Sequence, residues 1–187
     1  MSSISIIQAV VVLVASSCAA FTDVWRFKVY NALTLPLLVG GLVYHSIVGQ
    51  TAGLGGSLAG MAFGFGVLIV PYMVGALGAG DVKFVMAIGA WLGLTATGAV
   101  LVIGCIATGV YAIALIVIHR EYRLVWANIQ LAFFRLSTIG RHFGADDQIE
   151  SVQSMAKTDD RRRRLIPFSA MVSVGVVGTY VLIVWQQ

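Results

Sequence analysis

The chain is organised around one short turn, Gly78-Ala79-Gly80-Asp81-Val82-Lys83, which lies between two strongly apolar runs. The turn places one carboxylate next to sequence that is rich in hydrocarbon side chains. A charge near a lipid bilayer costs at least about 2–3 kcal/mol unless it faces a cavity or a partner. The best partner that the sequence offers is Asp23, which follows the first apolar run.

The composition is that of an integral membrane protein. Of the 187 residues, 59% are hydrophobic and only 11% are charged, whereas soluble domains are about 25% charged. We therefore expect a single all-α membrane domain over residues 1–187. The net charge of +4 does not indicate nucleic-acid binding, because the basic residues follow the membrane topology described below.

The cysteines and the N-terminal segment indicate neither a metal site nor a signal peptide. Cys18 and Cys105 each lie inside an apolar run, and without a CxxC pair they predict no zinc site or disulfide framework. Residues 2–20 lack the basic start of a signal peptide, so we expect a retained transmembrane helix there. We expect no metal or other cofactor.

Six apolar runs approach the roughly 20 residues that cross the hydrocarbon core of a bilayer. The boundary between the fourth and fifth runs falls somewhere in residues 93–98. The predicted spans are residues 4–22, 32–48, 54–74, 82–97, 98–118 and 167–185.

The basic residues indicate which ends of these six spans face the cytoplasm. All twelve Lys and Arg residues fall on one side, in the segments 23–31, 75–83 and 119–166. The positive-inside rule makes that side cytoplasmic, so both termini are expected outside.

The long cytoplasmic segment has two expected membrane contacts. Residues 121–143 mix apolar and charged side chains, which predicts an amphipathic helix on the membrane surface. The four arginines at 161–164 precede the last span, and we interpret them as an anchor to an anionic inner leaflet rather than a dedicated binding site.

Glycines at four-residue spacing predict close packing between spans. Gly56, Gly60 and Gly64 share one face of the third span, and Gly89 and Gly93 repeat the pattern in the fourth. Small residues let membrane helices approach closely. Such packing would bring Asp81 near other spans.

Asp23 and Asp81 are the acidic residues at membrane boundaries, and the topology puts both at the cytoplasmic edge. Two carboxylates a few ångströms apart share a proton and titrate together. That pair suits aspartyl proteolysis, in which one carboxylate takes a proton from water and the other polarises the peptide carbonyl. Gly78 and Gly80 would permit close approach of a substrate.

Other interpretations of these residues remain open. Asp81 could be an ordinary N-cap, and Asp23 could mark the end of the first span, although a carboxylate at a helix C-terminus opposes the macrodipole. A small proton-coupled transporter would also use paired carboxylates, but near the bilayer midplane. A non-catalytic assembly subunit would use residues 121–143 for docking.

Two motifs resemble those of the type IV prepilin peptidases. Gly78-Ala79-Gly80-Asp81 matches the GxGD signature of intramembrane aspartyl proteases, and the GDxK form of the family continues it to Lys83. The family's first motif is Asp, a basic residue, an aliphatic residue, often Pro, then Asn. Its counterpart here is Asp23, Arg26, Val29 and Asn31, with Tyr30 in place of Pro, and Pro167-Phe168 resembles the Pro-aromatic start of the final helix.

The resemblance implies a function and a set of site residues. It implies an aspartyl endopeptidase of the small Tad/Flp-pilus type in a bacterial inner membrane. Its substrate would be a prepilin or pseudopilin, cleaved at the cytoplasmic face, with pilus assembly machinery as a possible further partner. The paired CxxC motifs of the bifunctional members are absent, so we expect no N-methyltransferase activity.

Asp23 and Asp81 would then be catalytic, with Gly78, Gly80, Asn31 and Lys83 in support. Asn31 is expected to brace the first motif. We expect Lys83 to face lipid or to anchor the helix, because residues two apart on a helix point in different directions.

Overall fold

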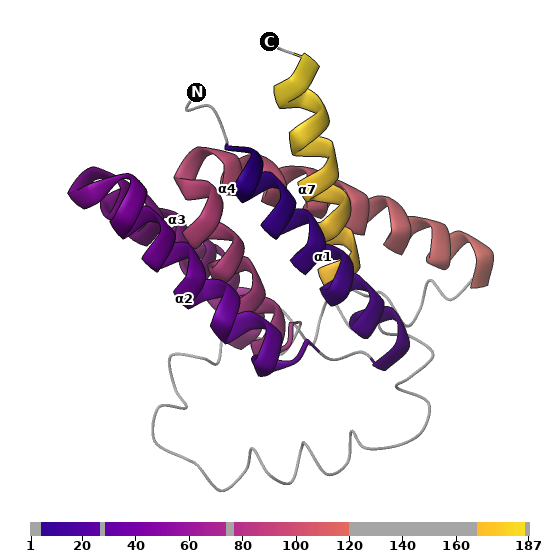
Figure 1. Ribbon diagram of the computed structural model, residues 1–187. Coiled ribbons are helices and arrows are strands. Elements are labelled where there is room, and N and C mark those ends of the chain that lie inside the picture. The colour runs from indigo at the N-terminus through magenta and orange to yellow at the C-terminus, as the bar shows by residue number, and fades with distance from the viewer. Residues whose placement is uncertain (1–4, 27–28, 74–76, 120–167, 186–187) are drawn as a thin grey trace, which may run out of the picture. The chain divides into compact units, whose positions relative to one another are not determined.

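The computed structural model describes residues 5–26, 29–73, 77–119 and 168–185 (Figure 1). Within these ranges it contains α-helices and no strand, and all five helices are long and apolar enough to cross a membrane. This agrees with the predicted all-α membrane class. The helices are α1 (Ile6–Arg26), α2 (Asn31–Val48), α3 (Gln50–Met73), α4 (Ala79–His119) and α7 (Phe168–Trp185).

The chain divides into two compact units. One covers Met1–Tyr111 and Pro167–Gln187 and holds α1, α2, α3, most of α4 and α7. The other covers Ala112–Ile166, of which the structure describes residues 112–119, the end of α4. The predicted amphipathic helix over residues 121–143 and the arginines at 161–164 lie outside the described residues.

The first half of α4 forms the core of the first unit. Phe84, Val85 and Ile88 are fully buried there, as expected for a helix that is apolar on every side. The Trp91 ring stacks on Tyr44 of α2 with 5.3 Å between ring centroids, and its Nε1–H donates to the Leu37 carbonyl at 2.7 Å. This core holds the N-terminal turn of α4 in place.

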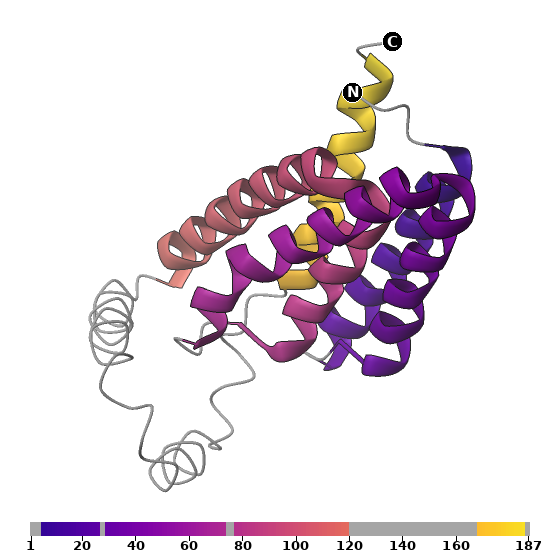
Figure 2. The same ribbon diagram turned by 90° about the vertical axis from the view of Figure 1, so that its left-hand side faces the viewer.

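Gly93 interrupts α4. Its φ of 73° is a left-handed conformation that glycine adopts without strain, and the helix changes direction near this point in both views (Figures 1 and 2). Carbonyls just before the break accept side-chain hydrogen bonds from other helices. Ser57 Oγ of α3 donates to the Ala90 carbonyl at 2.6 Å, and Gln8 Nε2 of α1 donates to the Trp91 carbonyl at 3.2 Å.

The break therefore falls inside the predicted range, residues 93–98, but at its first residue and not between the spans written as 82–97 and 98–118. Thr97 lies within helix, with its Oγ1 donating to the Gly93 carbonyl at 2.6 Å. With 41 residues, α4 would measure about 62 Å if it were straight. That is about twice the hydrocarbon thickness of a bilayer.

Two helix ends also differ from the predicted spans. Helix α1 continues to Arg26 instead of ending at residue 22, so Asp23 lies inside its last turns. Helix α3 begins at Gln50 instead of residue 54, which leaves Gly49 alone between α2 and α3. Loss of hydrophobicity marks the edge of the bilayer, but a helix continues past that edge when no residue breaks it.

The glycine packing is confirmed for most of the predicted positions. A Cβ on Gly60 of α3 would overlap the backbone of Gly89 and Gly93 in α4, and a Cβ on Gly64 would press on Val85. The contact is looser at Gly56, where an added Cβ would meet nothing within 4 Å, although the Gly56 carbonyl oxygen would lie 3.8 Å from a Cβ added to Gly93. The α3–α4 contact is therefore centred on Gly60.

Candidate active site

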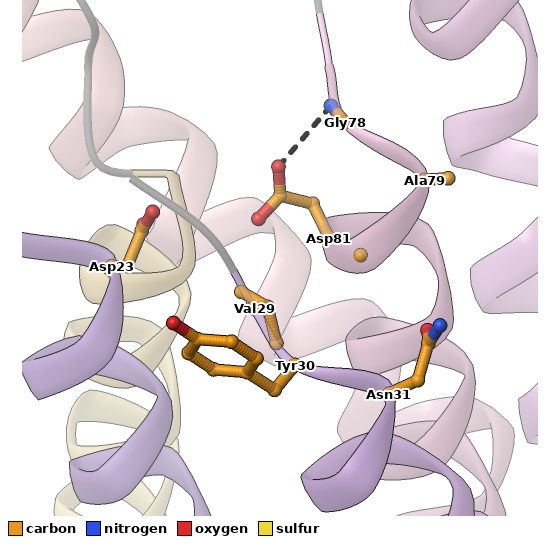
Figure 3. A pocket seen from close by; sticks show the side chains of 8 residues that line it. Asp23, Val29, Tyr30, Asn31, Gly78, Ala79 and Asp81 are labelled. Atoms are coloured by element: carbon orange, nitrogen blue, oxygen red, sulfur yellow. Dashed lines mark hydrogen bonds between the residues drawn. The ribbon is translucent and has the colours of Figure 1, made fainter. Parts of the chain in front are cut away.

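A cavity of about 340 Å³ lies where the end of α1, the start of α2 and the start of α4 meet (Figure 3). This volume is at the lower end of the roughly 300–1,000 Å³ typical of ligand sites. The cavity brings together five of the six site residues predicted from the sequence, all except Lys83. Its lining residues are Asp23, Val29, Tyr30, Asn31, Gly78, Ala79, Gly80 and Asp81.

Asp23 is held by the last helix of the chain. Its side chain is only 6% exposed, and its Oδ2 accepts a hydrogen bond from the backbone N–H of Ser169 at 3.0 Å. One turn further along α7, Ser173 Oγ donates to the Ser16 carbonyl of α1 at 2.8 Å. The packing of α1 on α7 thus fixes where this carboxylate lies.

Asp81 is the third residue of α4 and helps to begin that helix. Its Oδ2 accepts the Gly78 N–H at 3.3 Å, and its own N–H donates to the Gly78 carbonyl at 3.1 Å. The side-chain bond is the one that an acidic residue makes at the third position of a capping box. Asp81 therefore has a structural role, but with one oxygen only: Oδ1 is buried and has no hydrogen-bond partner among the described residues.

The two carboxylates face the same space. Figure 3 shows both side chains directed into the cavity, with the Tyr30 hydroxyl pointing toward Asp23. The charge of Asp23 acts electrostatically on Asp81. Two carboxylates that interact in this way compete for ionisation, and one of them retains a proton more easily than the other.

Lys83 is not among the residues that line the cavity, but it contacts Asn31, which does line it. Its Nζ donates to Asn31 Oδ1 at 3.0 Å, which joins the first turn of α4 to the first residue of α2. The two helices begin side by side, so the long lysine side chain reaches its neighbour. The expectation that Lys83 faces lipid or anchors the helix stays a prediction. The contact agrees with a bracing role for Asn31.

Gly80 is required where the segment before α2 crosses α4. A Cβ at this position would lie 2.8 Å from the Val29 carbonyl oxygen and 3.2 Å from the Val29 Cβ. Gly78 is different, since a Cβ there would meet Asp81 Oδ2 at an ordinary 3.4 Å. An added Cβ is therefore obstructed at Gly80 but not at Gly78.

Sequence reasoning missed some of the residues that shape the site. Tyr30 entered only as a departure from a motif, yet it lines the cavity. Ser169 was not singled out, because its contribution to Asp23 is a backbone N–H that carries no residue-type signature. Within the described ranges, no cluster of three or more His, Cys, Asp or Glu residues is arranged to hold a metal ion.

Comparison with known proteins addresses the same region. Residues 10–113, more than half of the chain, match the type IV leader peptidase family. The matched stretch includes both carboxylates of the cavity together with Lys83. No solved structure matches the chain significantly.

Similar curated proteins carry a related name. Two of them are the prepilin leader peptidase/N-methyltransferase of Aeromonas salmonicida strain A449 and that of Aeromonas hydrophila, each 34% identical over 110 residues. The match covers 55% of this chain but only 38% of either relative. The family predicted from the two motifs is therefore confirmed, and the chain belongs to the type IV leader peptidase family.

Proposed function

We propose that this chain is a membrane-embedded aspartyl endopeptidase that removes the short basic leader from type IV prepilins or Flp prepilin-like proteins. The observation that carries the proposal is the shared cavity of Asp23 and Asp81, which lie on different helices far apart in the sequence. Membership of a leader peptidase family and the names of the relatives support the substrate class. The proposal covers peptide-bond cleavage and not methyl transfer.

The chemistry needs no group beyond these side chains and water. A peptide bond that enters the cavity would lie beside both carboxyl groups, with one water molecule between them. One carboxylate removes a proton from the water as it attacks, and the other carboxyl group donates to the carbonyl oxygen. The cavity that both carboxyl groups line would receive the substrate chain beside Asp81.

The proposed membrane arrangement has six crossings in a bacterial inner membrane. Helix α4 would supply two of them, because it is about twice as long as one crossing needs and is interrupted at Gly93. With the basic segments in the cytoplasm and both termini outside, the last turns of α1 and the first turn of α4 meet at the cytoplasmic face. A prepilin presents its basic leader and the start of its apolar helix there, near the anionic leaflet.

The positions of the carboxylates favour a peptidase over a proton-coupled carrier. Asp23 and Asp81 lie in terminal turns of their helices, whereas carboxylates that carry protons across a membrane are needed near its midplane. A boundary position instead suits cleavage between a polar leader and an apolar helix.

The test is co-expression of this chain with an Flp prepilin, followed by gel mobility and mass spectrometry of the pilin N-terminus. The wild-type chain should release the leader, and the Asp23→Asn/Asp81→Asn double variant should leave the prepilin intact while it inserts normally. Processing by the double variant at the wild-type rate would exclude the proposed chemistry.

The two motif glycines provide a matched pair of variants. Gly80→Ala should slow leader cleavage by roughly 10²-fold, because its methyl group displaces Val29 and a shift of about 1 Å is enough for such a loss. Gly78→Ala, in the same turn, should remain within a few fold of wild type. Initial cleavage rates in membranes with matched amounts of each variant would check this, and equal losses in the two variants would argue against the role given to Gly80.

A further inference from the structure

The two carboxylates of the cavity are held in different ways, and the difference distinguishes their roles. Asp23 Oδ2 accepts a backbone N–H at 3.0 Å in a buried hydrogen bond. Asp81 Oδ2 accepts a longer bond of 3.3 Å on the exposed side of the site, and Asp81 Oδ1 has no partner among the described residues. One group therefore lies beside a buried donor, and the other has an unused oxygen.

The donor to Asp23 comes from a helix N-terminus. Ser169 is the second residue of α7, so its N–H is one of the four that a helix leaves without an internal acceptor. The N-terminus of a helix carries a partial positive charge that stabilises a nearby anion. A hydrogen bond from an N–H to a carboxylate favours the ionised form in addition. The start of α7 thus offsets the unfavourable position of Asp23 at the C-terminal end of α1.

Contacts between α1 and α7 hold the Ser169 N–H beside Asp23. Ser169 is fully buried, and Ser173 Oγ bridges to the Ser16 carbonyl at 2.8 Å. These contacts leave little freedom for the carboxylate to turn away from α7. Tyr30 is the other described titratable side chain that lines the cavity, and Lys83 is occupied by Asn31.

Of the two carboxyl groups, that of Asp81 is the one that retains the shared proton more easily. If both groups were ionised, Asp81 would experience the charge of Asp23 and would keep a buried, unpaired oxygen. An unpaired charge of this kind is costly in a poorly solvated site. A protonated Oδ1 removes that cost, and Figure 3 shows this oxygen directed into the space between the two side chains.

We infer that Asp23 is the general base, that Asp81 is the general acid, and that the N–H of Ser169 is a positioning group that holds the Asp23 carboxylate in place. This assignment rests on the proposed endopeptidase function. It identifies Ser169, which lies outside the region that matches the family, as part of the site machinery.

The reaction then balances as follows. Water attacks the carbonyl carbon, its proton goes to Asp23, and the carbonyl oxygen takes the proton of Asp81, which gives a neutral tetrahedral diol. The C–N bond breaks as Asp23 returns its proton to the departing nitrogen. A diol hydroxyl returns a proton to Asp81 as the new carboxylic acid forms, so both side chains regain their starting states.

The test is the pH dependence of leader cleavage by Ser169→Pro and Ser169→Ala, measured on purified protein in liposomes with a synthetic peptide that joins a basic leader to a short apolar segment. Proline removes the N–H in the first turn of α7, where no carbonyl of the helix accepts it, and alanine keeps the N–H. We expect the acid limb of the Ser169→Pro profile to move toward higher pH by about one unit, because an unsupported carboxylate loses its charge more easily. Ser169→Ala keeps the N–H, so its acid limb should stay at the wild-type pH whatever happens to the height of its plateau.

An unshifted limb in Ser169→Pro, with only a lower plateau, would overturn the assignment to Asp23. That result would leave the proposed endopeptidase function standing, because that function is contradicted only if the Asp→Asn variants still cleave the leader.

Infrared spectroscopy provides a second test that does not depend on the proline variant. In a pH titration, the carbonyl band of a protonated carboxylic acid should persist to higher pH in wild type than in Asp81→Asn. Asp23→Asn should keep this band but lose it at lower pH than wild type, because the charge of Asp23 is gone. Any other pattern, including absence of the band from wild type or its loss in both variants, would contradict the assignment.

Discussion

Replacement of either Asp23 or Asp81 by Asn is expected to reduce leader cleavage by roughly 10²–10⁴-fold, the usual contribution of a general acid or base. Replacement of both is expected to cost little more than replacement of one. The carboxyl groups share one cavity and act on the same water and the same peptide bond, so either loss disables the other group as well. Residues that act as a unit show such non-additive losses.

Glu150→Gln is the matched control for this prediction. It removes one acidic charge from the cytoplasmic side expected from the sequence, but from the polar segment over residues 144–160. Single-turnover rates for the four variants and wild type would decide the question. If the loss in the double variant equalled the product of the two single losses, the carboxylates would be acting independently, and the shared site would be wrong.

The second large effect is expected for Gly60→Ala. A methyl group at this position meets the backbone of Gly89 and Gly93 and has no space, so α3 must move away from α4. Overpacking of this kind lowers the free energy of unfolding by about 1–3 kcal/mol. Because α4 carries Asp81, cleavage should fall together with stability.

Gly56→Ala is the control, one turn away on the same helix. Its methyl group meets nothing within 4 Å, and alanine favours a helix over glycine by up to about 1 kcal/mol. Thermal unfolding in detergent should therefore show Gly56→Ala at or slightly above wild type and Gly60→Ala well below it. Equal unfolding temperatures for the two variants would argue against close contact of α3 and α4 at Gly60.

The sequence predicted the part of the site that depends on charge. A carboxylate at a membrane edge is costly, so Asp23 and Asp81 stood out against an apolar chain, and both line one cavity. The helix ends were harder to predict, because hydropathy reports the bilayer edge. Helix α1 therefore continues past residue 22 without any signal in its hydrophobicity.

The remaining differences depend on geometry that residue types do not encode. Gly93 and Gly98 are both plausible break points by sequence, and only the backbone shows that Gly93 takes the left-handed conformation. The partner of Lys83 depends on α2 and α4 beginning side by side. The donor to Asp23 is a main-chain group of a helix more than a hundred residues later in the sequence.

The most direct measurement is chemical cross-linking of cysteines at positions 23 and 81. The variant would carry Asp23→Cys and Asp81→Cys in a background with Cys18→Ser and Cys105→Ser, since both native cysteines are exposed. Ser5→Cys with Asp81→Cys is the control, because Ser5 directly precedes α1 and lies about 27 Å from Asp23 at the helical rise per residue. Short thiol-specific bifunctional reagents would be applied in native membranes, and linked peptides would be identified by mass spectrometry.

We expect a 23–81 cross-link in the test variant and none in the control. If both cysteines of the test variant reacted singly with the reagent but no 23–81 linked peptide formed, the two carboxylates would not share a site, and the proposed peptidase mechanism would be contradicted.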